Sequence, residues 1–191
     1  METNTKFYDI AFIGHYTKDT IVSTLGTRIV DGGAFNYGAN VAARMGLKVA
    51  AVTRMAKEDL RVVEKLKHLG VDVFSHISPQ STCLRLEYPT SDVDERIIYI
   101  TSSAGPFITT EVENIHARAI VVGASMRGEV SLKIIEELAK KKTILAADVQ
   151  SFIRVNDNGK LVPKEWPERN DIFACLDILK TDAVEAGLLF G

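Results

Sequence analysis

The chain has 191 residues, of which 46% are hydrophobic and 25% charged, and its formal net charge is -2. This length suits one domain with a substantial core, and the composition is that of an ordinary globular protein. Lysine and arginine are spread along the chain without a basic block, and no apolar run approaches the ~20 residues of a membrane span. We therefore expect a single domain of a cytoplasmic protein that binds neither nucleic acid nor membranes.

The first predicted element is a buried strand followed by a polar segment. Apart from Asp9, residues 8–14 form an apolar run that ends in glycine, which is typical of a strand covered on both faces of a sheet. Residues 15–20 predict a loop at its carboxyl end, where open α/β sheets bind their ligands. Asp19 is therefore a candidate site residue, although loop aspartates also serve as turn or cap residues. Of the four histidines, only His15 lies at a strand's carboxyl end.

The next feature, residues 30–46, passes through paired glycines into a helix rich in small residues. Gly32 and Gly33 allow the backbone to approach another backbone or a ligand where a Cβ would collide. Asn36 and Asn40 are four residues apart, so on a helix they share one face. Such a face could bind a polyhydroxyl ligand, but a tight turn followed by a packed helix explains the same residues equally well.

Strand and helix patterns alternate along the rest of the chain. Buried-strand patterns occur at 48–54, 71–74, 118–123, 143–148 and 176–180, and helical patterns at 57–69, 129–141 and 182–190. This order predicts parallel βαβ units, and so a mostly parallel central sheet flanked by helices. We expect a loop over 151–170, because Asn156 to Gly159 is a strong turn signal.

Two regions break this rhythm and predict a small β lid. Residues 82–88 and 95–101 alternate in part between apolar and polar positions, which leaves one face wet or covering another part of the molecule. A second hairpin-like excursion lies within 20–30, around Gly26. Together they predict a lid formed by about 17–31 and 82–104. The alternative is that 82–104 forms an antiparallel edge of the main sheet.

Several well-known catalytic and nucleotide-binding motifs are absent. No GxGxxG follows the first strand and no GxxxxGK[ST] occurs, which argues against a generic Rossmann-like domain and a P-loop. Neither HExxH nor GxSxG is present.

The order of the remaining features resembles the PfkB or ribokinase-like family of ATP-dependent sugar and nucleoside kinases. One matching stretch ends at Gly46 and reads Gly-Gly, seven residues, Val-Ala, three residues and Gly. The other is 179–191, which is similar to the family's strand–helix segment with its N-x-x-E motif. The resemblance implies a ribokinase-like α/β fold in which the central sheet carries a β lid.

The resemblance also implies a substrate site. Asp19 would bind sugar hydroxyls, Gly32 and Gly33 would let the backbone approach the sugar, and Asn36 or Asn40 would hydrogen-bond it. The lid would exclude water and pair with the lid of a second subunit, which implies a homodimer.

A second set of implied roles concerns ATP and Mg²⁺. Glu185 matches the glutamate that helps to organise magnesium and phosphate, and carboxylate oxygens suit this hard cation. Asp182 stands where the family has asparagine, and it is a candidate to act on the metal through water.

The chain also departs from the family pattern. Counted from Gly46, Asn36 falls one place early and Tyr37 occupies the expected position. The family's catalytic aspartate and glycine-rich anion hole lie downstream of N-x-x-E, and no such motif is present here. We therefore expect residues 1–191 to form a single α/β domain that is incomplete at its C-terminus and lacks the catalytic base.

These features predict the substrate-side half of a phosphotransferase that moves the γ-phosphate of ATP to a hydroxymethyl group of a sugar or nucleoside. The alternative is a non-catalytic or truncated domain that binds a small polyol or assembles through its lid.

Overall fold

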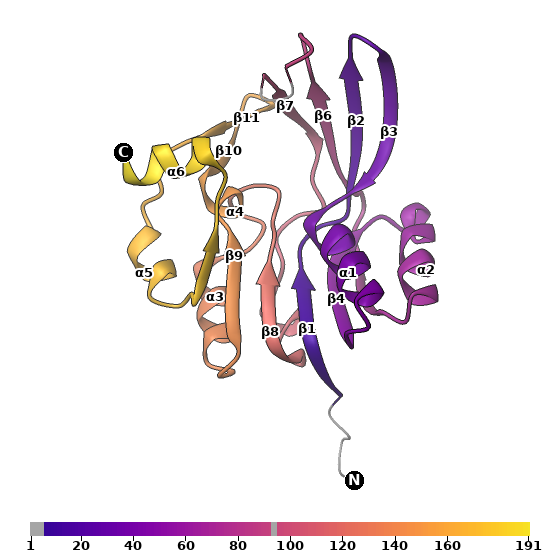
Figure 1. Ribbon diagram of the computed structural model, residues 1–191, viewed down its shortest axis with the longest axis vertical. Coiled ribbons are helices and arrows are strands. Elements are labelled where there is room, and N and C mark those ends of the chain that lie inside the picture. Colours follow the sequence, from indigo (N-terminus) through magenta and orange to yellow (C-terminus); the bar gives the residue numbers. More distant parts are fainter. Residues whose placement is uncertain (1–5, 93–94) are drawn as a thin grey trace.

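The computed structural model describes residues 6–92 and 95–191 and arranges them as two six-stranded sheets, one above the other (Figure 1). The central sheet has the order β12-β9-β8-β1-β4-β5, and each neighbouring pair is parallel. Its strands are β1 (Phe7–Ile13), β4 (Val49–Met55), β5 (Asp72–Ile77), β8 (His116–Val122), β9 (Ile144–Asp148) and β12 (Ile178–Lys180). The predicted α/β class with a mostly parallel central sheet is therefore confirmed.

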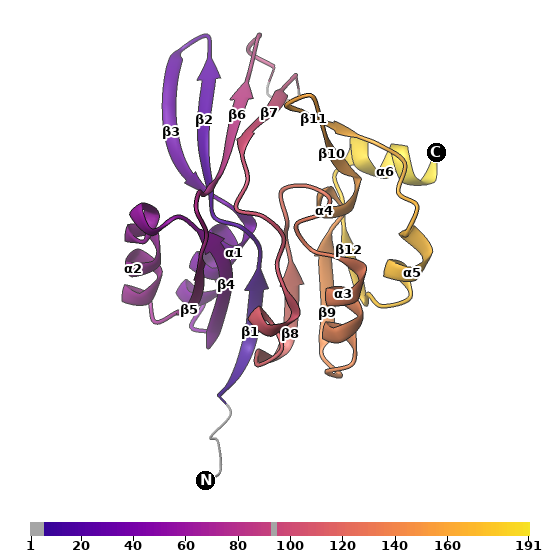
Figure 2. The same ribbon diagram turned by 180° about the vertical axis from the view of Figure 1, so that it is seen from behind.

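Helices cover both faces of the central sheet (Figures 1 and 2). They are α1 (Ala34–Arg44), α2 (Arg61–His68), α3 (Leu132–Ala139), α4 (Gln150–Ile153), α5 (Arg169–Phe173) and α6 (Ala183–Phe190), with short 3-10 turns η1 (Lys57–Asp59) and η2 (Thr109–Glu111). Alternate residues of β4 divide between two cores: Ala51 faces the core under α1 and α2, whereas Val52 faces the core under α3. In the described part of the chain, no helix is long and apolar enough to cross a membrane.

Helix α1 lies very close to the sheet because its residues are small. A Cβ on Gly38 would collide with the ring of Phe12 on β1. Ala39 and Ala42 on the same helix are buried. This close packing fixes the start of α1 beside the carboxyl end of β1.

The second sheet has the order β10-β11-β7-β6-β2-β3. Its strands are β2 (Thr17–Ser23), β3 (Gly26–Gly32), β6 (Thr82–Glu87), β7 (Ile97–Ser102), β10 (Arg154–Asp157) and β11 (Lys160–Pro163). β2 pairs with β6 in parallel, and the other neighbours are antiparallel. Residues 82–87 and 97–102 thus lie in a separate sheet above the carboxyl ends of the central strands, and not at an edge of the central sheet.

Three segments differ from the sequence-based expectations. Residues 17–20 belong to strand β2, so Asp19 lies within a strand and not in a loop. Residues 150–163 form α4 and the hairpin β10–β11 where a loop was expected; the turn signal at 156–159 marks the tip of this hairpin. Helix α3 begins at Leu132, which leaves Glu129 in the preceding loop. Pairing with β3 and β6 makes 17–20 part of a strand, and the pairings of β10 with β11 and of β11 with β7 do the same for 154–157 and 160–163.

Candidate functional site

The two central strands β1 and β8 mark the point where the order of the sheet reverses. β1 leads to β4 and β5 on one side, whereas β8 leads to β9 and β12 on the other. The connections after them run close together: Gly123 donates its N–H to the Ile13 carbonyl at 2.9 Å, and a Cβ on Gly14 would collide with the Gly123 carbonyl. Open parallel sheets bind ligands at the carboxyl ends of their strands at such a reversal.

Asp19 lies above this point on β2. It pairs with Val30 on β3 and Leu84 on β6, and residues paired in this way share a face of the sheet. Leu84 belongs to the small core of that face, against which Met126 packs from the loop after β8. The side chain of Asp19 therefore lies on the face that overlooks the carboxyl ends of β1 and β8.

The carboxyl group of Asp19 is only partly satisfied. Burial raises the pKa of this carboxyl group, and a hydrogen bond from the Thr17 hydroxyl lowers it by less. Its Oδ1 is buried and has no hydrogen-bond partner among residues 6–92 and 95–191. A buried, unpaired acceptor is costly to the fold, so its presence points to a ligand that donates hydrogen bonds.

Gly32 and Gly33 lie directly beside Asp19. A Cβ on Gly32 would collide with Asp19 Oδ2 and Thr17 Oγ1. Gly33 has a φ of 97° and a Cβ there would collide with the His15 carbonyl oxygen. Only glycine fits this turn at low cost, and it brings the backbone to the base of the site.

The two asparagines of α1 have different partners. Asn36 donates from Nδ2 to the Asp31 carbonyl at 3.2 Å, which ties the helix to the end of β3. Asn40 accepts from Nε of Arg44 at 2.8 Å, one turn along the helix. Tyr37 is half exposed, and the charge of Asp19 raises the pKa of its hydroxyl in addition to the larger effect of burial. Asn36 is thus held at the glycine turn, whereas Asn40 contributes to a contact along α1.

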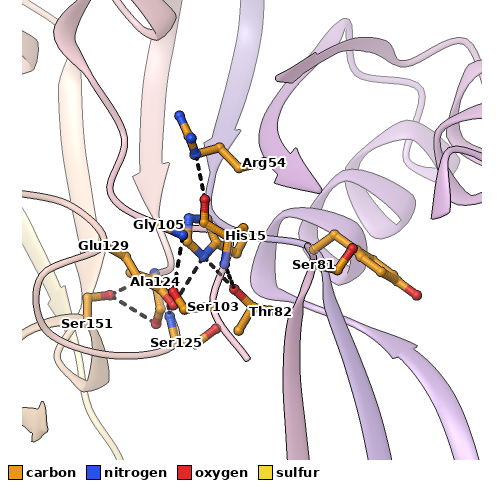
Figure 3. A network of polar contacts seen from close by, with 12 residues as sticks. His15, Arg54, Ser81, Thr82, Ser103, Gly105, Ala124, Ser125, Glu129 and Ser151 are labelled. Atoms are coloured by element: carbon orange, nitrogen blue, oxygen red, sulfur yellow. Dashed lines mark hydrogen bonds and ion pairs between the residues drawn. The ribbon is translucent and has the colours of Figure 1, made fainter. Parts of the chain in front are cut away.

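Figure 3 shows a buried polar network around His15 and Glu129 that sequence reasoning did not identify. His15 and Glu129 are 0% and 1% exposed, and Nδ1 of His15 lies 3.1 Å from Oε1 of Glu129. The same Nδ1 lies 2.8 Å from the Thr82 hydroxyl, which accepts the Ala104 N–H at 3.1 Å. Glu129 accepts the Ser125 N–H at 2.7 Å. His15 was noted at its strand end, but nothing in the sequence linked it to a glutamate 114 positions away.

The other predicted cluster is at the start of α6. Asp182 caps the helix by accepting the Glu185 N–H at 2.8 Å, and Glu185 in turn accepts the Asp182 N–H at 3.0 Å. Arg154 lies 3.3 Å from Oε1 of Glu185. Burial lowers the pKa of Arg154, against the opposing effect of Glu185. A capping box explains both carboxylates structurally.

A cavity of about 220 Å³ opens beside this cap. Its lining includes Arg96, Arg154 and Lys160 together with Asp182 and Glu185. Larger cavities of about 620 and 310 Å³ lie at the tip of the β2–β3 hairpin and beside α5 and α6, and their linings do not include Asp19. Among the residues that the structure describes, no three His, Cys, Asp or Glu side chains group together as a metal site.

No family model and no curated protein matches the chain. A pyrophosphate-dependent kinase in the ribokinase family, solved as a sulfate complex, is 34% identical over 95% of this chain and 65% of that chain, with a TM-score of 0.89. A pyrophosphate-dependent kinase of the same family, complexed with a pyrophosphate analogue and myo-inositol, is 32% identical over 95% of this chain and 64% of that chain, with a TM-score of 0.88.

More distant kinases share the fold alone. Ribokinase from Arabidopsis thaliana, complexed with ribose and ATP, is 16% identical over 96% of this chain and 63% of that chain, with a TM-score of 0.66. The chain spans less than two thirds of the length of each of these three proteins.

Proposed function

We propose, from the ribokinase-like fold that this chain shares with those kinases, that it binds a polyol ring and presents one hydroxyl for phosphoryl transfer. The resemblance to the PfkB or ribokinase-like family that the sequence predicts is confirmed over 95% of the chain. The neighbours support a sugar-kinase-like enzyme. The substrate, the phosphoryl donor and the catalytic activity of this chain are part of the proposal.

The proposed binding site for the phosphoryl acceptor rests on one observation. This is the unpaired Oδ1 of Asp19 above the Gly32–Gly33 turn. A ring with adjacent hydroxyls would donate to this carboxylate and approach the glycine backbone from the other side. Hydrogen bonds to a charged acceptor are the stronger kind, so Asp19 would fix the orientation of the ring. In this proposal Asn36, which is held at the same turn, would also contribute to the site, and Asn40 would do so less directly.

The cation-lined cavity supports a polyphosphate donor. Arg96, Arg154 and Lys160 outnumber Asp182 and Glu185 in its lining. Arginine and lysine are the side chains that bind phosphate. Because the kinases reported above at 34% and 32% identity are described as pyrophosphate-dependent, pyrophosphate is the first donor to test, with ATP as the second.

Magnesium fits the same place on the chemistry of its ligands. Glu185 and Asp182 offer only carboxylate oxygens, and Mg²⁺ is usually bound by one or two carboxylates, several waters and substrate phosphates. When bound, the ion would neutralise charge on the transferred phosphoryl group. The residues of this chain would hold the donor phosphates and orient the acceptor hydroxyl, and the base that takes the hydroxyl proton is unassigned.

The second sheet would then act as a lid over the bound ring, which would exclude water from the transferred phosphoryl group. Its strands lie directly above the carboxyl ends of β1 and β8. A homodimer formed through this sheet stays a prediction; sedimentation velocity over a range of protein concentrations tests it.

The proposal is tested by calorimetric titration of the protein with myo-inositol, ribose and inosine, followed by mass-spectrometric detection of a phosphorylated product with Mg²⁺ and pyrophosphate or ATP. Binding of one polyol by the wild type and its loss in Asp19→Ala, at unchanged circular dichroism, supports the acceptor site. Binding without product supports the alternative, a non-catalytic polyol-binding domain. No binding of any polyol, or equal binding by Asp19→Ala, overturns the proposal.

A further inference from the structure

We propose that Glu129, His15 and Thr82 are positioning residues that tie the second sheet to the carboxyl ends of β1 and β8, and so determine where Asp19 lies. Each comes from a different part of the fold (Figure 3). His15 follows β1, Thr82 begins β6, and Glu129 lies in the loop between β8 and α3. The inference deepens the proposed function and rests on it for its binding measurement alone.

The central contact is the hydrogen bond between Nδ1 of His15 and the Thr82 hydroxyl, at 2.8 Å. The same Nδ1 lies 3.1 Å from Oε1 of Glu129. Oε1 of Glu129 and Nε2 of His15 are buried and have no hydrogen-bond partner in the described chain, so Glu129 contacts the ring without an aligned hydrogen bond.

Thr82 connects this pair to Asp19 through the sheet. It pairs in register with Thr17, and Thr17 hydrogen-bonds the Asp19 carboxyl group. Thr17 and Thr82 are 2% and 0% exposed, so water does not compete for these bonds. Backbone pairing of β6 with β2 thus connects the buried contacts at Thr82 to Thr17 and Asp19, a connection that we call the path from Glu129 to Asp19.

Further contacts surround His15, Glu129 and Thr82. The ring of His15 packs on Phe107 with centroids 5.0 Å apart, and Phe107 donates its N–H to the Glu129 carbonyl at 2.8 Å. Thr82 also accepts the Ala104 N–H where the chain returns from β7. Both connections of the β6–β7 hairpin to the lower part of the molecule therefore meet at Thr82.

A purely structural role predicts a different outcome from a positioning role. If the network only stabilises the core, its loss should lower global stability and raise amide exchange throughout the protein. If it holds β2 and β6 over the site, exchange should rise at 16–19 and 82–84 while 50–52 of β4 stays protected. Thr82→Val removes the bond to His15 directly, and Glu129→Gln replaces the carboxylate beside Nδ1 with an amide and so perturbs the same bond. The loss of one buried hydrogen bond corresponds to about a tenfold change.

The test compares Glu129→Gln and Thr82→Val with the wild type by hydrogen–deuterium exchange and by the NMR signal of the Asp19 carboxyl carbon. Glu129→Gln keeps the shape and the Ser125 acceptor, and Thr82→Ser should restore the wild-type pattern. Ser151→Ala is the matched control, because its buried hydroxyl accepts the Ala124 N–H at 2.9 Å but lies outside the path.

The expected result is about tenfold faster exchange confined to 16–19 and 82–84, a shifted Asp19 signal, and about tenfold weaker polyol binding in both variants. Uniform exchange changes, an unmoved Asp19 signal, or the same pattern in Ser151→Ala overturns the inference. If the wild type binds no polyol, the proposed function fails, whereas exchange and the Asp19 signal still decide whether the path positions Asp19.

Discussion

The two faces of the β2–β3 hairpin carry two aspartates with opposite surroundings. Asp31 accepts from the Tyr16 hydroxyl at 2.8 Å, from Arg61 at 2.7 Å and from Lys65 at 3.1 Å. Burial raises the pKa of Asp31, but the hydrogen bonds and the two cations outweigh it, so the pKa is lowered. Asp19 has a hydrogen bond from Thr17 and an unpaired Oδ1, and its pKa is raised. The comparison separates a carboxylate that the fold satisfies from one that it leaves partly unpaired, which we propose binds the ligand.

The largest expected effect concerns Asp19. Replacement of Asp19 by Asn should weaken polyol binding about a hundredfold, because hydrogen bonds to a charged acceptor contribute ~1.5–3 kcal/mol. Isothermal titration calorimetry measures this change. Asp31→Asn is the control and should alter the affinity by less than about twofold; equal losses in both variants would remove the distinction between the two faces.

The next effect concerns the fold. Asp31→Ala should lower the free energy of unfolding by about 1–3 kcal/mol, because the hydroxyl of Tyr16, a residue 0% exposed, loses its acceptor. Urea unfolding followed by circular dichroism measures it. Asp31→Asn keeps an acceptor for the Tyr16 hydroxyl and should lower the free energy of unfolding by less. A loss no larger than that of Lys65→Met would show that the Tyr16 bond contributes little.

The pH dependence of stability should differ in sign between the two aspartates. The lowered pKa of Asp31 gives stability that is present above its unfolded pKa and lost as the pH falls through the folded pKa. The raised pKa of Asp19 costs stability as the pH rises above its unfolded value of 3.8. Asp19→Asn should therefore stabilise the ligand-free protein at pH 7 by roughly 1 kcal/mol or less.

Urea unfolding at pH 7 and pH 3 measures the free energy of unfolding of both variants. Asp31→Asn should lower it at pH 7, whereas Asp19→Asn should raise it. The gain from Asp19→Asn should disappear at pH 3, where the wild-type carboxyl group is protonated. A loss of stability at pH 7 would mean that Asp19 is satisfied within the fold.

The smallest effect concerns the exposed rim of the Asp31 cluster. Lys65→Met should cost about 0.5 kcal/mol, since the lysine side chain is 67% exposed and surface ion pairs contribute little. The cost should vanish in 1 M NaCl. Thermal unfolding at low and high salt measures it, and a salt-independent loss would point to packing of the lysine stem instead.

The sequence predicted the central sheet well because most of its strands are rich in apolar residues and alternate with helices. It was less informative about the second sheet, where β2 and β6 pair across more than 60 positions and β10–β11 extends the sheet as a short polar hairpin. Asp19 and the Gly32–Gly33 turn were identified as candidates, but the loop assignment concealed the strand that positions Asp19.

The sequence was also less informative about the contacts within the candidate site, for a similar reason. Asn36 and Asn40 were grouped by helical spacing alone, whereas their partners in the fold differ. The contact between His15 and Glu129 joins two loops that no local pattern connects. Residues that meet only through tertiary structure leave no periodic signal in the sequence.

The interleaved order of the two sheets has a consequence for how the chain folds. The strand pairs of the second sheet come from three insertions, each made after the chain has passed through the central sheet. Pairing β2 with β6 closes a long loop, and such contacts form slowly. We expect the central sheet to form first and to align the hairpins, so that the buried contact at Thr82 forms late on the folding pathway.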